Sequence, residues 1–389
     1  MGLFSRTYQV STDEQAISDL LVRGVENVVP RDLAEKKLRS GERLKIYFGV
    51  DPTGAKLHLG HSVPLRKLKS FADLGHEVVF LVGDFTARIG DPSGRDALRE
   101  PLTRTQVEEN LRDYKRQASK VFDLSGVEVR YNHEWLSKLT FEEITKLASN
   151  FTVQQMLKRD MFQKRLKEDR PIALHEFLYP LMVGYDSVML DVDAELGGSD
   201  QEFNMLAGRT LQQALGKKDK FVLTTKLIEG TDSRKMSKTY NNAVYFDDTP
   251  SDMYGKIMSV RDELVERYFT LCTRVPMREV EDILTGHPKE AKERLAKEIV
   301  TIYHGTDAAE KAQSGFMKPD DAPTITVVRG TKLRDIVSEL GLSTSELRRL
   351  VEQGAIETAR GEKISTIDTE LADTTLKVGK HRFFKITLT

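Results

Sequence analysis

The stretch LKIYFGVDPTGAKLHLGH, residues 44–61, decides the fold of this chain. It opens on an alternating apolar run that predicts a strand, and the turn sequence DPTG then ends that strand. A helical pattern follows, with these apolar residues on one face: Val63, Leu65, Leu68, Phe71 and Leu74. His58 and His61 are therefore expected at the N-terminus of a helix that directly follows a strand.

The start of this helix suits a phosphate group, because free backbone N–H groups and the helix dipole both attract anions. Gly60 allows a nucleotide to approach the backbone closely. Far along the chain, the loop KMSKT at residues 235–239 adds two lysines in a sequence rich in Gly, Ser and Thr. Either motif alone is a weak signal, but together they supply imidazole and ammonium groups for a triphosphate.

Strand and helix patterns alternate from residue 44 to about residue 225. The continuous apolar run at 78–82 is typical of a buried parallel strand, and residues 127–131 and 221–224 are further strand candidates. This alternation predicts an α/β fold with a Rossmann-like, doubly wound parallel sheet. In such folds ligands bind at the carboxyl ends of the strands, where the HLGH motif lies.

Composition and pattern divide the chain into three domains. Residues 1–225 are predicted to form the α/β domain, which carries a charged helical insertion at about 102–170. Residues 226–318 hold the lysine loop and an α-helical domain, followed by a Pro- and Asp-rich linker. Residues 325–389 are predicted to form a small α+β domain.

Two local patterns add detail at the ends of the chain. Residues 1–40 show helical spacing that is expected to pack on the α/β core (Ile17, Leu20, Leu21 and Val25). In the last domain, Ser343 and Glu346 match a capping box at the start of a helix.

The composition indicates a soluble globular protein of 389 residues, with 39% hydrophobic and 31% charged residues. The net charge is 59 − 60 = −1, so any nucleic-acid binding must depend on local basic patches. The single cysteine, Cys272, excludes an intrachain disulfide and a cysteine-based zinc site, and its apolar neighbours predict a buried thiol. No secretory signal or long apolar run is visible, so a cytoplasmic location is expected.

The motif pair resembles the HIGH and KMSKS signatures of class I aminoacyl-tRNA synthetases, which activate an amino acid with ATP and transfer it to tRNA. Three further motifs are similar to those of bacterial tyrosyl-tRNA synthetases: IGDPSG (89–94), YPLMVGYD (179–186) and GGSDQ (197–201). The resemblance covers the chain from about residue 30 onward, and its last domain resembles the S4 RNA-binding domain. It implies a homodimeric tyrosine–tRNA ligase that acts on L-tyrosine, ATP and tRNA(Tyr), with the helical insertion at the dimer interface.

The resemblance also implies which residues act on ATP. Catalysis would depend on positioning and on cationic stabilisation of the phosphoryl oxygens, by His58, His61, Lys235, Lys238 and Thr239. The remaining ATP contacts would come from Asp51, Thr53, Gly60, Gly198, Asp200, Met236 and Ser237. Mg²⁺ is expected to arrive with the triphosphate, without a tightly bound metal of the protein's own.

The implied tyrosine site consists of Tyr47, Asp91, Tyr179, Val183, Asp186 and Gln201. Tyr47 and Asp186 would converge on the phenol hydroxyl, so an analogue without this hydroxyl would leave buried polar groups unpaired. One position departs from the family pattern, because Val183 stands where those enzymes carry a Gln that helps to hold the α-ammonium group. Losing one hydrogen bond to a charged group costs roughly 1.5–3 kcal/mol.

Basic residues of the last domain are candidates for phosphate contacts with tRNA, although a solvated charged face is the alternative for each: Arg348, Arg349, Lys363 and Lys380. Two other functions remain open. A paralogue that activates a modified tyrosine is favoured by Val183. An RNA-binding protein that has lost catalysis is opposed by the intact HLGH and KMSKT motifs. Tryptophanyl enzymes share those motifs but are not expected to carry the Tyr47/Asp186 pair.

Overall fold

The computed structural model describes residues 9–54, 56–93, 102–124, 126–237, 240, 242–316, 322–359, 361–379 and 382–389. The chain divides into two compact units. The first comprises residues 1–247 together with 266–277, and the second comprises residues 248–265 together with 278–389. The predicted division into three domains stays a prediction.

A six-stranded sheet forms the centre of the first unit, in the order β1-β6-β5-β2-β3-β4. Its strands are β1 (Val25–Val29), β2 (Lys45–Val50), β3 (Glu77–Val82), β4 (Glu128–Tyr131), β5 (Ala194–Gly198) and β6 (Phe221–Thr225). The pairs from β6 to β4 are all parallel, and only the edge strand β1 runs antiparallel to its neighbour. The predicted parallel α/β sheet is confirmed.

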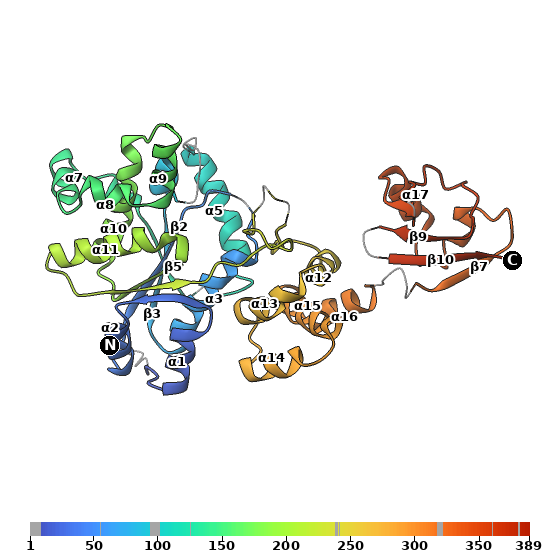
Figure 1. The fold of residues 1–389 in the computed structure, drawn as a ribbon, viewed down its shortest axis with the longest axis horizontal. Coiled ribbons are helices and arrows are strands. Elements are labelled where there is room, and N and C mark those ends of the chain that lie inside the picture. The colour runs from blue at the N-terminus through green and yellow to red at the C-terminus, as the bar shows by residue number, and fades with distance from the viewer. Residues whose placement is uncertain are drawn as a thin grey trace, which may run out of the picture. The chain divides into compact units, whose positions relative to one another are not determined.

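Helices cover both faces of this sheet (Figure 1). One face carries α3 (Leu59–Asp73) and α5 (Arg104–Ala118), and the other carries α10 (Tyr179–Leu190) and α11 (Glu202–Ala214). The chain leaves β2 toward β3 but leaves β5 toward β6 on the opposite side. Ligands of open α/β sheets bind at such a switch point, so the crevice between β2 and β5 is the expected site.

The N-terminal segment differs in part from the expectation. Helix α1 (Glu14–Val22) packs on the core as expected, since the buried Lys67 of α3 donates to the carbonyl of Leu20 over 2.7 Å. Val25, however, is not part of this helix. Gly24 adopts a φ of +69°, which ends the helical path, and Val25 then begins β1.

The shorter elements of the first unit lie around the sheet. They are α2 (Arg31–Arg39), α4 (Thr86–Ile89), α6 (His133–Leu136), α7 (Phe141–Ala148), α8 (Val153–Leu157), α9 (Asp160–Lys167), η1 (Leu174–Phe177) and η2 (Ser199–Gln201). The insertion is thus mainly helical, as predicted, apart from strand β4. Helix α13 (Val265–Cys272) carries Cys272, which is buried, as its apolar neighbours predicted.

The second unit begins with helices and ends with a small sheet. The helical part consists of α12 (Pro250–Met258), η3 (Asp262–Leu264), α14 (Met277–Leu284), α15 (Pro288–His304) and α16 (Thr306–Ser314). The sheet has the order β7-β10-β9-β8, with β7 (Thr324–Val327), β8 (Ile356–Thr358), β9 (Thr374–Val378) and β10 (Arg382–Leu388). Helix α17 (Thr344–Glu352) and η5 (Leu333–Ile336) accompany this sheet (Figure 1).

This last part of the chain has a hydrophobic core of its own, formed among the described residues by side chains between Val327 and Ile386. The predicted capping box is confirmed, because the Ser343 side chain accepts from the backbone N–H of Glu346 and the Glu346 carboxylate accepts from that of Ser343. Across the described part of the chain, no helix combines the length and the apolar character needed to cross a bilayer.

Candidate active site

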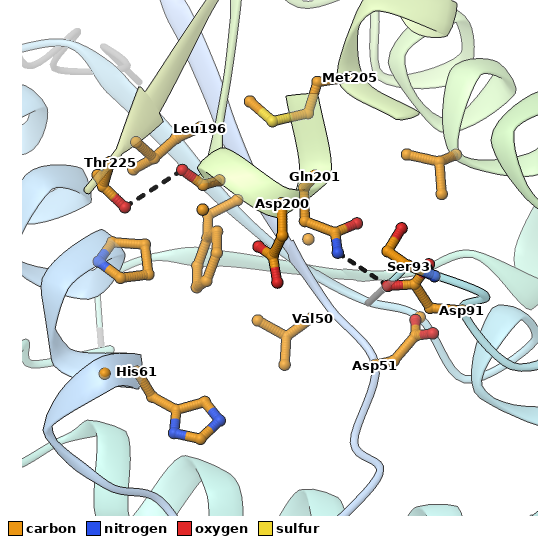
Figure 2. A pocket seen from close by; sticks show the side chains of 18 of the residues that line it. Val50, Asp51, His61, Asp91, Ser93, Leu196, Asp200, Gln201, Met205 and Thr225 are labelled. Carbon is orange, nitrogen blue, oxygen red and sulfur yellow. Dashed lines mark hydrogen bonds between the residues drawn. The ribbon is translucent and has the colours of Figure 1, made fainter. Parts of the chain in front are cut away.

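A cavity of about 430 Å³ opens at the carboxyl ends of β2 and β5 (Figure 2). It collects nearly all predicted ATP and tyrosine residues, namely Tyr47, Asp51, Thr53, His58, Gly60, His61, Asp91, Tyr179, Val183, Asp186, Gly198, Asp200, Gln201, Lys235 and Met236. Ser237 is not among its lining residues, and Lys238 and Thr239 lie outside the described residues. Residues that are far apart in the sequence thus share one cavity, as their motifs predicted.

The two histidines stand at the N-terminus of α3. The Nδ1 of His58 accepts the N–H of Gly60, and the Nδ1 of His61 accepts the N–H of His58, each over 3.2 Å. Burial lowers the pKa of His58 to about 2, helped by His61 and Lys235, and lowers that of His61 to about 4. Both rings are therefore neutral at pH 7, and with Nδ1 accepting they carry their proton on Nε2.

This arrangement serves two purposes at once. The histidines cap the helix, which is the structural role that each would have in isolation. Their Nε2–H groups remain as hydrogen-bond donors for a ligand in the cavity, where Figure 2 shows His61. Gly60 is required beside them, because a Cβ at this position would lie 2.9 Å from Cε1 of His58.

The lysine loop reaches the same cavity. Lys235 Nζ lies 3.2 Å from Oδ2 of Asp200, which follows β5. The buried Asn242 holds the loop in place: its Oδ1 accepts the N–H of Ser237 over 2.9 Å, and its Nδ2 donates to Asp232 over 2.6 Å. Asn242 was not singled out in the sequence, because only its contacts with both arms of the loop reveal its role.

A second cluster of polar groups surrounds Asp51. Tyr179 donates its hydroxyl to Oδ2 of Asp51 over 2.8 Å, and Thr86 donates to Oδ1 over 2.7 Å. Gly83 makes room for this carboxylate, since a Cβ there would lie only 2.0 Å from Oδ1 of Asp51. Asp51, which was predicted as a nucleotide contact, therefore also orients the Tyr179 ring at the amino-acid side.

Asp91 is fixed by its neighbours in the same region. Gln201 donates to Oδ2 of Asp91 over 2.8 Å (Figure 2), and the backbone N–H of Ser93 donates to Oδ1 over 2.9 Å. Asn204 in turn donates to Gln201 over 2.8 Å. Asp51 and Asp91 thus present two carboxylates near Tyr179, which suits a cationic group of a ligand. Val183 also lines the cavity but offers no polar side-chain atom.

The other predicted pair lies deep in the cavity wall. Asp186 is buried and accepts from Trp135 Nε1 over 2.7 Å and from Asn132 Nδ2 over 3.2 Å. Burial raises the pKa of Asp186 well above its usual range, against the effect of these two donors. Tyr47 is also buried, and its hydroxyl oxygen lies 3.0 Å from Oγ of Ser187. Trp135, Asn132 and Ser187 were missed in the sequence because no motif connects them to Asp186 and Tyr47.

The predicted tRNA contacts belong to the second unit. Arg348 and Arg349 are exposed on α17, and Lys363 is exposed after β8. Lys380 lies outside the described residues.

Comparisons with known proteins show which family the sequence matches. The family model of class I tRNA synthetases (W and Y) matches residues 39–318. The tyrosine–tRNA ligase of Thermotoga maritima is 43% identical, over 96% of this chain and 98% of that protein. The tyrosine–tRNA ligase of Carboxydothermus hydrogenoformans is 44% identical, over 95% of this chain and 97% of that protein.

Solved structures resemble the fold as well. A C-terminally truncated mitochondrial tyrosyl-tRNA synthetase from Coccidioides posadasii is 28% identical with a TM-score of 0.63, covering 77% of this chain and 91% of that one. A tyrosyl-tRNA synthetase from Archaeoglobus fulgidus, solved in complex with L-tyrosine, is 20% identical with a TM-score of 0.61 and covers 77% of this chain and 99% of that one. The second likeness shows the fold alone.

Proposed function

Because this chain belongs to the class I tyrosine–tRNA ligase family, we propose that its cavity activates L-tyrosine with ATP and that the tyrosyl group then passes to the 3′ end of tRNA(Tyr). One observation carries this proposal. A buried hydroxyl and a buried carboxylate, from Tyr47 and Asp186, line the same cavity as the His58 and His61 pair. The first pair suits a phenol, and the second suits a phosphate.

The chemistry requires positioning more than covalent help. The carboxylate of tyrosine attacks the α-phosphorus of ATP, a phosphorus–oxygen bond breaks, and pyrophosphate leaves with its electron pair. The Nε2–H groups of His58 and His61 would donate to phosphate oxygens, and Lys235 would neutralise the charge that develops on the leaving group. Mg²⁺ would enter with ATP on the phosphate oxygens. The roles of Lys238 and Thr239 rest on the KMSKT motif.

Asp200 would accept hydrogen bonds from the ribose hydroxyls. Since Lys235 pairs with Asp200 in this structure, ribose binding would release the lysine toward the phosphates. Gly198 brings the backbone close to Asp200, because a Cβ there would lie 2.8 Å from Oδ1 of that residue. Met236 and Thr53 would complete the nucleotide contacts.

The amino acid would lie with its phenol toward Tyr47 and Asp186. Its ammonium group would meet Asp91 and the hydroxyl oxygen of Tyr179, whose own proton goes to Asp51. Gln201 would hold the reacting carboxylate nearby. These roles leave the position of Val183 without a polar contact to the ammonium group.

Exposed apolar side chains support a homodimer. Phe141 is 86% exposed and belongs to the helical insertion together with the exposed Val153 and Leu166, and Leu174, just after the insertion, is 79% exposed. Apolar residues that gather on a monomer surface mark contact sites. We place a second copy of the chain on this surface.

The exposed Arg348, Arg349 and Lys363 support an RNA contact by the last part of the chain, with Lys380 added from its sequence position alone. Lysine and arginine side chains of this kind contact phosphates and make binding depend on salt. A cytoplasmic location would bring the enzyme to its tRNA.

The first test is ATP–pyrophosphate exchange by the purified protein with each of the twenty amino acids and with modified tyrosines. We expect exchange with L-tyrosine and not with phenylalanine, followed by charging of tRNA(Tyr). Exchange only with a modified tyrosine would assign the alternative substrate that Val183 favours. If no amino acid supports exchange, the proposal that this protein is an enzyme would be overturned. Lys238→Ala is the matched variant, and we expect it to lose adenylation while it keeps tRNA binding.

A further inference from the structure

A buried lysine lies behind the phenol end of the cavity. Lys220 precedes β6, and its side chain is 0% exposed. It is ion-paired with Glu195 of β5 and donates to Oγ of Ser187 over 2.6 Å. The same Oγ lies 3.0 Å from the hydroxyl oxygen of Tyr47, so the ammonium group connects with Tyr47 through one serine.

The space around this network is closed. Gly208 of α11 packs against it, and a Cβ at this position would lie 2.4 Å from Oγ of Ser187 and 2.5 Å from Nζ of Lys220. No larger side chain fits between α11 and the network. The serine, which belongs to α10, is therefore held between Lys220 and Tyr47 and against α11.

The number of available hydrogens determines which of these groups donates to which. An ammonium group only donates, so Ser187 accepts from Lys220. The serine hydrogen then goes either to Oε2 of Glu195, over 3.1 Å, or to Tyr47. Glu195 already accepts from Lys220, and the Tyr47 hydroxyl interacts with both Ser187 and Glu195. Burial raises the pKa of the Tyr47 hydroxyl, so Tyr47 keeps its own hydrogen.

A bound phenol distinguishes the two orders. If Ser187 donates to Tyr47, the hydrogen of Tyr47 can turn from Glu195 to the phenol oxygen. The phenol hydrogen then goes to Asp186, which acts as an acceptor because both of its oxygens already accept from Asn132 and Trp135. Every hydroxyl in this chain then donates once and accepts once. If Tyr47 instead donates to Ser187, Tyr47 and Asp186 could both act only as acceptors for the single phenol hydrogen. The phenol oxygen would then receive no hydrogen bond from Tyr47.

We propose that Lys220 and Ser187 are specificity-determining residues, which act through Tyr47 by aiming its hydrogen at the phenol oxygen of the substrate. The chain runs from the Lys220 ammonium through Ser187, Tyr47 and the phenol to Asp186. Hydrogen bonds in such a chain polarise one another, and an unpaired member in a buried site is costly. Phenylalanine breaks the chain in the middle, so it loses the contribution of both ends. This inference rests on tyrosine as the substrate of the cavity.

The test is a double-mutant cycle on substrate discrimination, with Ser187→Ala, Tyr47→Phe and the double variant. Ser187→Ala keeps the ion pair of Lys220 with Glu195 but cuts the chain. We expect it to lower kcat/KM for tyrosine in pyrophosphate exchange by about tenfold, the equivalent of one buried hydrogen bond, with little change for phenylalanine. In the Tyr47→Phe background, Ser187→Ala is expected to cause no further change in the ratio of kcat/KM for tyrosine to kcat/KM for phenylalanine.

The ion pair is tested separately by Lys220→Met combined with Glu195→Gln, which removes both charges and leaves no buried charge unpaired. We expect the same loss of discrimination, again absent in the Tyr47→Phe background. Lys218→Met is the matched control, because Lys218 is ion-paired with Asp193 and takes no part in the hydrogen-bond chain of Lys220. This control is expected to leave the tyrosine-to-phenylalanine ratio unchanged.

The outcomes separate two failures. If the unchanged protein exchanges with tyrosine but Ser187→Ala adds its full effect to Tyr47→Phe, the ordered chain is wrong while the proposed function stands. Equal losses for tyrosine and phenylalanine, in variants whose melting curves show a folded protein, would also overturn it. If the unchanged protein shows no exchange with tyrosine, the proposed function itself fails.

Discussion

Val183 occupies the cavity position at which the resemblance to tyrosyl-tRNA synthetases leads us to expect a Gln. It lies one helical turn after Tyr179 on α10 and lines the cavity without a polar atom. We expect Val183→Gln to lower the KM for tyrosine about tenfold, because one hydrogen bond to a charged group contributes about 1.5–3 kcal/mol. Steady-state exchange kinetics check this. Val183→Leu, which adds bulk without polarity, is the control, and an unchanged or higher KM in Val183→Gln would contradict the expectation.

His58 and His61 are expected to make folding depend on pH. Burial lowers their pKa values from 6.5 to about 2 and about 4, so below pH 6.5 the unfolded chain binds more protons than the folded one. The free energy of unfolding therefore falls as the pH drops from about 6.5 toward 4, by up to about 1.4 kcal/mol per pH unit for each histidine. Urea titrations between pH 4 and 7 measure this slope. A variant with His58→Asn and His61→Gln should show a smaller slope, and an equal slope would show that other groups cause it.

At the scale of elements, the lysine loop is held by backbone hydrogen bonds and by one buried side chain. Asn242 bonds to Ser237 and Asp232, and Gly230 leaves room for it, since a Cβ there would lie 2.2 Å from Cγ of Asn242. We expect Asn242→Ala to lower kcat for adenylation about tenfold or more, because Lys235 would lose its fixed position near the phosphates. The affinity for tyrosine, measured by calorimetry, should stay the same. A change confined to tyrosine binding would instead place the role of Asn242 in the amino-acid site.

Local sequence patterns predicted most of the helices and strands of the first unit. Apolar runs identified the strands at 78–82 and 221–224, and the turn after Val50 correctly predicted the start of α3. Strand β1 was missed because Val25 continues the helical spacing of α1, and the break depends on the left-handed conformation of Gly24. Strand β5 was missed because its last residues belong to the GGSDQ motif, which resembled a turn.

At the scale of the whole molecule, the last part of the chain is expected to serve tRNA and not adenylation. Its core is built from its own side chains in the part that the structure describes. Deleting residues 325–389 should leave pyrophosphate exchange within about twofold and strongly reduce tRNA charging, because phosphate contacts would be lost. Equal loss of both activities would contradict this. Arg348→Ala with Arg349→Ala is the milder variant, and it should weaken charging more at low salt than at high salt, because phosphate contacts contribute most when salt is low.

The insertion is expected to hold two copies of the chain together. Phe141 is highly exposed, and removing its side chain from water in an interface would stabilise the assembled protein. We expect Phe141→Asp to shift the protein from dimer toward monomer in sedimentation velocity. Glu142→Ala, a change at the neighbouring polar residue, is the control. A monomer in the unchanged protein would disprove this interface.

The motifs predicted many of the residues that line the cavity. Asp91 with Gln201 and Lys235 with Asp200 come from separate segments of the chain, whereas His58 and His61 belong to one motif. The sequence also located the cavity at the carboxyl ends of the strands, since a parallel sheet places those ends along one edge.

The hydrogen bonds that orient these residues could be identified only in the folded structure. Trp135 and Asn132 reach Asp186 from the insertion, and Ser187 meets Tyr47 from a position 140 residues away. Hydrophobic periodicity and turn chemistry act between near neighbours, so they determined most of the helices and strands and the edge of the sheet at which the cavity opens. The partners of a buried polar group depend on how several elements pack together, so the direction of the Tyr47 hydroxyl follows from tertiary contacts that no local pattern encodes.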